Sequence, residues 1–212
     1  MNIFVLSNDP RSAAHAHCDR HVVKMIIEYA QLMSTAHRLL DGVVQTFQKP
    51  NGKKQVLRVL PHETVTFNAD KEKYVIQGQV CYGVTHHNHP CAIWARECTS
   101  NYLWLLDLFT ELCQEYTHRY KREHKTHKDL YKYLSRPPHH LDPSIDQGGL
   151  TPFPQTMPDE YRNEDTVHAY QNYYVGAKAS FARWTNREVP TWFKNNIKDY
   201  NASNFERTTA VD

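Results

Sequence analysis

Glycine, paired cysteines and long apolar runs are all scarce in this sequence, and each scarcity excludes a class of protein. Only 7 of the 212 residues are glycine, and no Gly-rich phosphate loop or GxSxG elbow is present, so P-loop and α/β-hydrolase chemistry is excluded. The five cysteines (Cys18, Cys81, Cys91, Cys98 and Cys113) are odd in number and lack a CxxC spacing, which argues against thioredoxin-like chemistry. We interpret them as free, buried thiols in a reducing compartment.

The N-terminal apolar run and the charge totals restrict the setting further. Residues 3–6 (IFVL) form a short strand or a packed arm, and they are too few for export or for crossing a bilayer. We therefore expect a cytoplasmic protein with no membrane partner. The 25 Lys and Arg nearly balance the 23 Asp and Glu, so the totals show no strong field for nucleic acid. Histidines (14) and aromatic residues (12%) are abundant, which indicates a ring-rich surface or cleft.

Hydrophobic periodicity predicts a mainly α fold: a single helical domain over residues 1–193 with a small β-hairpin excursion. The predicted helices cover residues 10–18, 19–40, 90–120, 129–134 and 164–186. The excursion covers residues 43–87 and contains two predicted strands, 55–60 and 74–82. Residues 136–158 hold six of the eleven prolines and are expected to form an extended loop. Residues 194–212 are expected to be a flexible tail.

The predicted helix 19–40 carries a polar stripe at alternating steps of three and four residues, which places its members on one face. The stripe consists of His21, Lys24, Glu28, Gln31, Thr35 and Arg38. If the stripe lines a cleft, Glu28 is a candidate general base or electrostatic stabiliser, and Lys24 is a candidate amine nucleophile. The alternative, which the spacing alone favours, is a solvated helix face with an ordinary surface ion pair.

A second constellation lies before the predicted helix 90–120. Residues 85–90 read THHNHP, and Arg96 follows. A helix N-terminus attracts anions, so His86, His87, Asn88 and His89 suit a phosphate. A zinc site is the alternative, but the histidines lack the spacing of HExxH and no acidic residue interleaves them. A cap that only fixes the helix start is the third possibility.

Basic and aromatic residues interleave in the second half of the chain. They are Arg119, Lys121, Arg122, His124, Lys125, His127 and Lys128, followed by Arg187, Trp192 and Lys194. Such a mixture suits a nucleic-acid backbone with unstacked bases. A solvated charged face is the alternative.

Three segments, in order, resemble the bacteriophage pyrimidine-dimer DNA glycosylases of the endonuclease V type. The run 19–28 (DRHVVKMIIE) is similar to the first helix of that family, with Glu28 at the position of the catalytic glutamate. The run 157–162 (MPDEYR) is similar to the Pro-x-Glu-Phe-Arg segment of the family, and residues 187–194 are similar to its closing Arg-Pro-Thr-Trp-Tyr-Lys. The runs 18–25 (CDRHVVKM) and 88–96 (NHPCAIWAR) resemble an uncharacterised phage branch.

The resemblance implies an all-helical fold that grips duplex DNA and flips a base or kinks the duplex. In that family the N-terminal α-amine attacks the sugar C1′, forms a Schiff base, and cuts the strand by elimination, with the glutamate supporting both steps. The present chain departs from the family in having Asn2, which disfavours removal of Met1, and in having Ile27 and Gln31 at two arginine positions. Lys24 is therefore an alternative amine.

The sequence thus predicts a DNA glycosylase/AP lyase-like enzyme that acts on damaged or modified pyrimidines in double-stranded DNA. The alternatives are a phage DNA-modifying transferase on the same scaffold and a non-catalytic protein that binds nucleic acid or a nucleotide. No cofactor and no metal are expected. The expected catalytic residues are Glu28, Lys24 and His21. The expected DNA or phosphate contacts are His86, His87, Asn88, His89, Arg96, Arg38, Gln31, Arg187, Trp192 and Lys194.

Overall fold

The computed structural model describes residues 1–142 and 149–198. Within this part of the chain the fold is mainly helical, with two small antiparallel hairpins of two strands each, which confirms the predicted fold class. None of the helices in the described residues is long and apolar enough to cross a membrane. Parts of the loop predicted at 136–158 and of the tail predicted at 194–212 lie outside the described residues.

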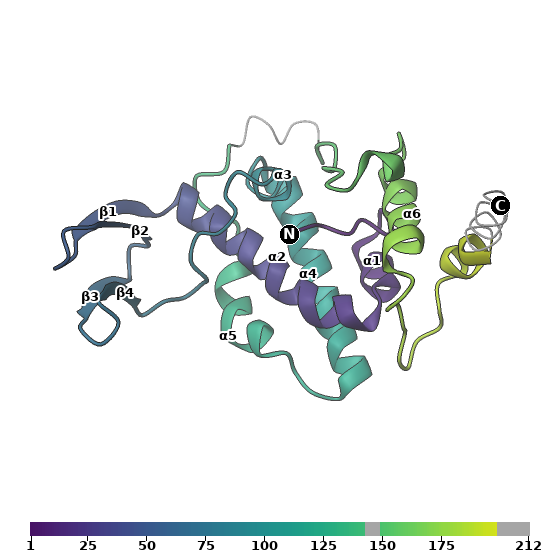
Figure 1. The fold of residues 1–212 in the computed structure, drawn as a ribbon, viewed down its shortest axis with the longest axis horizontal. Coiled ribbons are helices and arrows are strands. Elements are labelled where there is room, and N and C mark those ends of the chain that lie inside the picture. The colour runs from purple at the N-terminus through teal and green to yellow at the C-terminus, as the bar shows by residue number, and fades with distance from the viewer. Residues whose placement is uncertain (143–148, 199–212) are drawn as a thin grey trace, which may run out of the picture. The chain divides into compact units, whose positions relative to one another are not determined.

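The elements follow one another along the chain as Figure 1 shows. They are α1 (Pro10–Ala16), α2 (Asp19–Leu40), β1 (Val43–Gln48), β2 (Lys54–Val59), β3 (Thr64–Asn68), β4 (Lys73–Gln77), α3 (Pro90–Trp94), α4 (Thr99–Tyr120), α5 (Lys125–Leu134), the 3₁₀ turn η2 (Asp159–Tyr161) and α6 (Thr166–Lys178).

The chain divides into two compact units, where the sequence predicted a single domain. The first unit comprises Met1, Ile27–Leu106 and Lys125–Pro152, and the second comprises Asn2–Ile26, Asp107–His124 and Phe153–Asp212. Helices α2 and α4 therefore each contribute residues to both units. Each unit is described by itself below.

Capping side chains start the helices where the sequence signals place them. Asp9 precedes Pro10 and accepts a hydrogen bond from the backbone N–H of Ser12 at 2.8 Å, which fixes the start of α1. Asp165 accepts from the backbone N–H groups of Val167 and His168 and starts α6. α6 ends at Lys178, earlier than the predicted residue 186. Residues 191–198 are helical in the structure, so the first part of the predicted flexible tail, residues 194–198, belongs to a helix.

The excursion holds four strands in two hairpins, whereas the sequence predicted two strands. β1 pairs with β2, and β3 pairs with β4, both antiparallel. The predicted strand 74–82 stops at Gln77 because Gly78 takes a positive φ of 66°. The side chain of Gln55 bridges the hairpins, since it donates to the carbonyl of Tyr74 at 2.8 Å and accepts from the Tyr74 N–H at 2.9 Å.

The predicted helix 90–120 is two helices, α3 and α4, with a break at residues 95–98. Asn101 stabilises this break. Its side-chain amide donates to the carbonyl of Trp94 at 3.0 Å, and its side-chain oxygen accepts from the N–H of Thr151 at 3.0 Å. No glycine or proline interrupts the apolar pattern at the break, so hydrophobic periodicity predicts one continuous helix.

A buried ion pair joins the end of α2 to the hairpin excursion in the first unit. Both guanidinium NH₂ groups of Arg38 donate to the Glu63 carboxylate at 2.8 Å. The same guanidinium also donates to the carbonyls of Tyr82, Arg58 and Cys81. Arg38 is 1% exposed, so the position predicted as a DNA contact on a polar stripe is a structural anchor instead. The guanidinium donates its hydrogen bonds within the protein, and none of them is presented to solvent for a phosphate.

The second unit packs around aromatic rings. The N-terminal arm, residues 3–6, is buried, and Phe4 stacks on His21 with ring centroids 4.5 Å apart. His21 also hydrogen-bonds through Nδ1 to the hydroxyl of Tyr174. Burial, assisted by neighbouring positive charges, lowers the pKa of His21 to about 3, so its imidazole is neutral and enclosed.

Candidate functional site

Glu28 lies next to the N-terminal amine in the first unit. Helix α2 places the Oε2 atom of Glu28 3.9 Å from the α-nitrogen of Met1. The side chains of Met1 and Glu28 are only 4% and 13% exposed. Charges held so close and partly out of water interact more strongly than on an open surface. The structure therefore pairs the glutamate that the sequence singled out with a primary amine.

His89 contributes an imidazole to the same surroundings. Burial is the main cause that lowers its pKa, the positive charges of the N-terminal amine and His86 act in the same direction, and Glu28 opposes them. The Nδ1 atom of His89 accepts from the backbone N–H of Cys91 at 3.2 Å and caps α3. The neutral ring consequently carries its proton on Nε2, where it can act as a hydrogen-bond donor.

The two other histidines of the THHNHP segment and Asn88 are exposed. His86, His87 and Asn88 lie on the surface of the loop before α3. His86 has a positive φ of 45°, and its Nδ1 lies 2.6 Å from the hydroxyl of Thr85. No cluster of three His, Cys, Asp or Glu side chains suited to a metal occurs in residues 1–142 and 149–198. The phosphate contact predicted for this loop stays a prediction.

The other predicted site residues, on α2 and in the break after α3, differ from one another in burial. Lys24 is exposed, one turn before Glu28, and Gln31 is half-buried. His21 is buried in the ring cluster of the second unit, whereas Glu28 belongs to the first. Arg96 is half-buried and donates to the carbonyl of Ala92 at 2.5 Å. Of the six residues of the predicted stripe, His21, Thr35 and Arg38 are buried, Glu28 and Gln31 are half-buried and only Lys24 is exposed, so the stripe is not a solvated face.

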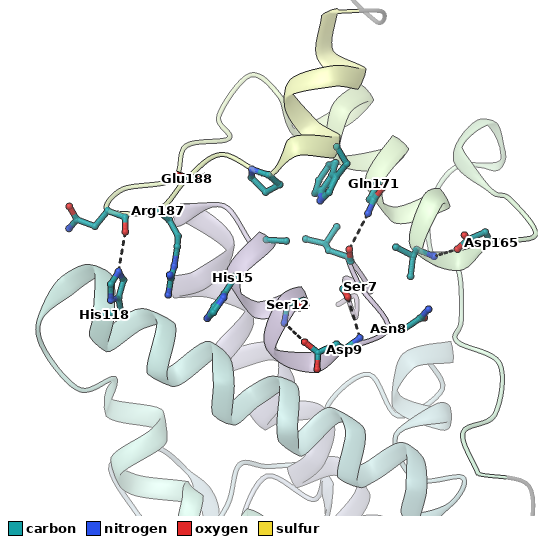
Figure 2. A pocket seen from close by; sticks show the side chains of 16 residues that line it. Ser7, Asn8, Asp9, Ser12, His15, His118, Asp165, Gln171, Arg187 and Glu188 are labelled. Carbon is teal, nitrogen blue, oxygen red and sulfur yellow. Dashed lines mark hydrogen bonds between the residues drawn. The ribbon is translucent and has the colours of Figure 1, made fainter.

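A cavity of about 1050 Å³ lies in the second unit. Two residues predicted to bind DNA, Arg187 and Trp192, line it. Figure 2 shows His15 on α1 and His118 on α4 near Arg187, with Asp165 and Gln171 on the α6 side. Lys194, also predicted as a DNA contact, is exposed in the helix that follows.

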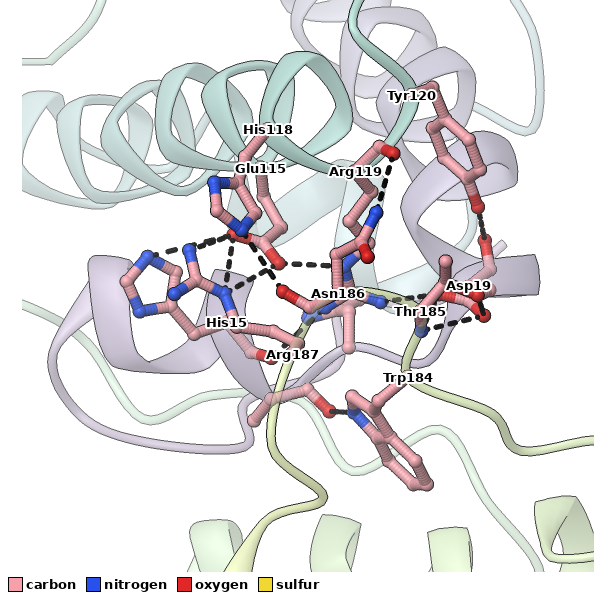
Figure 3. Close-up of polar contacts among 12 residues, drawn as sticks. His15, Asp19, Glu115, His118, Arg119, Tyr120, Trp184, Thr185, Asn186 and Arg187 are labelled. Atoms are coloured by element: carbon pink, nitrogen blue, oxygen red, sulfur yellow. Dashed lines mark hydrogen bonds and ion pairs between the residues drawn. The ribbon is translucent and has the colours of Figure 1, made fainter.

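Arg187 and His15, which line this cavity, belong to a buried charge network centred on Glu115, drawn in Figure 3. Arg187 donates to the Glu115 carboxylate at 2.6 Å, and Arg119 donates to it at 2.6 Å. The Nε2 atom of His15 lies 3.7 Å from Glu115. Burial disfavours the ionised carboxylate, but the hydrogen bonds from Arg187 and Arg119 outweigh it and lower the pKa of Glu115. Glu115 is therefore ionised at neutral pH.

Asp19 extends the network to the start of α2. Its carboxylate accepts from Arg119 at 2.8 Å and from the hydroxyl of Thr185 at 2.8 Å. Burial, and then Arg187, lower the pKa of His15, while Glu115 opposes them. At neutral pH the wall thus presents a neutral imidazole and the guanidinium of Arg187, whose side chain is 30% exposed. Sequence reasoning missed Glu115, although its four-residue spacing from Arg119 was a visible signal.

Comparison with protein-family models, with curated proteins and with solved structures finds no match to this chain. The resemblance to the pyrimidine-dimer glycosylases therefore remains a prediction from short motifs. The chain offers two candidate sites, the amine and carboxylate pair of the first unit and the cavity of the second.

Proposed function

We propose that this protein excises a damaged or modified pyrimidine from double-stranded DNA by amine and carboxylate chemistry. The observation that carries the proposal is the 3.9 Å separation between the α-nitrogen of Met1 and the Oε2 atom of Glu28. A primary amine beside a carboxylate is the pair that such a reaction needs, because the carboxylate can take the proton that the ammonium must lose before it attacks. The motif resemblance at residues 19–28 supports the same pair.

The proposed reaction has two stages, excision of the base and cleavage of the strand. The free amine attacks C1′ of the deoxyribose, the C1′–N bond to the base breaks, and the base leaves with the electron pair and gains a proton. Opening of the sugar ring leaves a protonated imine between C1′ and the amine. A base then removes a C2′ proton, the C3′–O bond breaks with the phosphate as leaving group, and water hydrolyses the imine to restore the amine. Glu28 is the proposed base in this second stage.

Other predicted residues are assigned supporting roles in this proposal. Lys24 is a second primary amine one turn from Glu28 and is the alternative nucleophile. Arg187 and Trp192 line the same cavity, and a cation together with an aromatic ring is a combination suited to a phosphate and an unstacked base. All five cysteines are free and buried, which supports action in a reducing compartment such as the cytoplasm.

Borohydride trapping tests the proposal directly. The protein is incubated with duplexes that contain an abasic site or one of a panel of damaged and modified pyrimidines, then reduced with borohydride. Trapping fixes the imine as a stable amine, and peptide mass spectrometry locates the DNA adduct. An adduct on the Met1 α-amine is expected. An adduct on Lys24 would replace the nucleophile but retain the reaction class, and Lys24→Arg would then abolish trapping.

Glu28→Gln separates catalysis from binding. The variant is expected to bind duplex DNA normally and to lose about a hundredfold or more in turnover, the range for removal of a general base. Glu164→Gln, at an exposed position, is the matched control and should keep full activity. If DNA binds with a steep salt dependence but no adduct, free base or nick forms, the non-catalytic alternative replaces the proposal. A nucleoside of shifted mass would instead support the transferase alternative.

A further inference from the structure

A second cavity, of about 700 Å³, lies in the first unit and is not part of the Glu28 site. Its lining includes His37 and Asp41 at the end of α2, together with His62, Tyr133 and Arg136. The volume falls in the range that small-molecule sites occupy. Acidic, basic and aromatic side chains therefore line one cavity.

The hydrogen bonds around His37 define its tautomer. The hydroxyl of Tyr102 donates its only proton to the carbonyl of Leu134 at 2.8 Å. Its oxygen must therefore accept from the Nε2–H of His37, at 2.9 Å. The Nδ1 atom of His37 is left with a lone pair. This atom is buried and has no hydrogen-bond partner among the described residues, and the side chain of His37 is 4% exposed. A buried acceptor without a donor is costly.

Asp41 places a second acceptor beside this nitrogen. Its Oδ2 atom lies 3.7 Å from His37 Nδ1, which is beyond hydrogen-bond distance. Asp41 accepts from the backbone N–H of His139 at 3.0 Å and from the Nδ1 of His140 at 2.9 Å. Burial disfavours the ionised form, but these hydrogen bonds outweigh it and lower the pKa of Asp41. Asp41 is therefore ionised, and a neutral imidazole and a carboxylate form a pair of adjacent acceptors.

Such a pair selects a ligand group with two N–H bonds on one nitrogen. An exocyclic amino group fits, because one of its hydrogens can reach His37 Nδ1 while the other reaches Asp41 Oδ2. A carbonyl at the same place would set a third acceptor against two others and leave all of them unpaired. Burial is the main cause that lowers the pKa of His37, to about 4, while Asp41 and the backbone of Arg136 act in the opposite direction. The imidazole thus stays an acceptor at neutral pH.

The rest of the lining indicates what carries the amino group. Tyr133 lies between two imidazoles, with its ring centroid 4.7 Å from that of His37 and 5.9 Å from that of His62, and aromatic walls suit a flat heterocycle. Lys132 and Arg136 line the same cavity and are exposed. They supply positive charge for an anionic group outside the polar interior. The carboxylate of Asp129 also lines the cavity but is paired with Lys125, so the charges of Lys132 and Arg136 remain available to the ligand.

We propose that this cavity binds a nucleoside monophosphate whose base carries an exocyclic amino group, of the cytidine or adenosine type, with the amino group on His37 and Asp41 and the phosphate toward Lys132 and Arg136. The site is separate from Glu28. His37 follows Glu28 by nine residues on α2, which places the two side chains on opposite faces of the helix and about 14 Å apart along it. The inference does not rest on the proposed function.

Calorimetric titration with two matched nucleotide pairs tests the assignment. Cytidine monophosphate is compared with uridine monophosphate, and adenosine monophosphate with inosine monophosphate, since each pair differs by an amino group against a carbonyl. The amino member of at least one pair is expected to bind about tenfold or more tightly than its partner, the size of one unsatisfied buried polar contact. Equal affinity within both pairs, or no binding by any of the four at about 1 mM, would overturn the proposal.

Two variants test which residues bind the phosphate and which bind the base. Arg136→Ala, at an exposed position, is expected to weaken the nucleotide severalfold while leaving the affinity for the corresponding nucleoside unchanged. Asp41→Asn is expected to reduce the preference for the amino base. Lys128→Ala, at an exposed position of α5 outside the lining, is the control and should bind normally. Glu28→Gln should also bind normally, so failure here and failure of the proposed function are distinguishable. Equal loss of nucleotide and nucleoside in Arg136→Ala would contradict the phosphate assignment.

Discussion

Each unit of this protein contains a buried arginine and glutamate centre, and the two centres are built differently. In the first unit, one arginine serves one glutamate: Arg38 binds Glu63, and its other donors reach backbone carbonyls. In the second unit, two arginines share Glu115, and one of them, Arg187, reaches a cavity. In the first unit, Arg38 is fully engaged with Glu63 and backbone carbonyls and is not available to a ligand. In the second unit, part of the Arg187 side chain is exposed. This difference separates a structural anchor from a candidate binding wall.

The largest expected effect comes from breaking the one-to-one pair. Arg38→Leu leaves the Glu63 carboxylate buried without its counterion, and we expect the free energy of unfolding to fall by about 3–5 kcal/mol. Urea unfolding followed by circular dichroism measures the change. The double variant Arg38→Leu/Glu63→Leu should recover part of the loss, because the uncompensated charge is then gone. A loss below 1 kcal/mol in the single variant would show that the pair is not the anchor described here.

A smaller effect is expected when one of the two arginines that share Glu115 is removed. Arg187→Leu leaves Glu115 paired with Arg119, so we expect a loss of about 1–2 kcal/mol, in the range of one hydrogen bond to a charged group. The same urea experiment measures it. The variant should also weaken duplex DNA binding and its salt dependence if the cavity contacts a phosphate. A loss as large as that of Arg38→Leu would remove the distinction between the two centres.

Both units are expected to lose stability on mild acidification, each through buried histidines. Burial lowers the pKa of His17 and His37 to about 4 and that of His21 to about 3, from an ordinary 6.5. As the pH falls below 6.5, the unfolded chain binds protons that the folded chain does not, so stability decreases toward pH 4. Glu63 and Glu115, whose pKa values are lowered mainly by arginine against the effect of burial, add a further loss below about pH 4.5.

Urea unfolding at a series of pH values between 7 and 3.5 checks this expectation. The histidine contribution predicts a decline that begins near pH 6.5. A stability that is level down to pH 4.5 and falls only below it would assign the acid sensitivity to the carboxylates alone.

The smallest effect is expected at the exposed pair between Lys125 and Asp129 on α5. The side chains are 86% and 43% exposed, and solvent screens such pairs almost completely. Lys125→Ala should leave the unfolding midpoint unchanged within error. A clear loss would mean that exposure is a poor guide to which ion pairs stabilise this fold.

Local sequence signals predicted the helices better than the contacts between them. Asp9 with Pro10 marked the start of α1, and the bounds of α2 were those predicted, because caps and helical periodicity are local. The break before α4 was missed because the amide that stabilises it, on Asn101, acts through contacts with Trp94 and Thr151. The role of Arg38 was missed for the same reason, since Glu63 lies 25 residues further along the chain.

The candidate sites, too, could be predicted only as far as local sequence signals reach. A motif identified Glu28, but its pairing with the Met1 amine depends on the tertiary structure. Periodicity placed Glu28 and His37 on one predicted helix, yet it gave no indication that His37 and Asp41 line a cavity. Arg187 and Trp192 were predicted from composition, whereas Glu115, which accepts from Arg187, lies on the predicted helix 90–120, whose periodicity carries no information on this contact.

The five buried thiols have a practical consequence. Cys81, Cys91 and Cys98 lie in the first unit, and Cys18 and Cys113 lie in the second. Burial raises the pKa of Cys18, Cys81 and Cys113, which keeps these thiols unreactive toward alkylating reagents while the surrounding structure is closed. Pulsed alkylation with peptide mass analysis would therefore record the opening of each unit separately, without any engineered cysteine. The native chain carries its own set of unit-specific unfolding reporters.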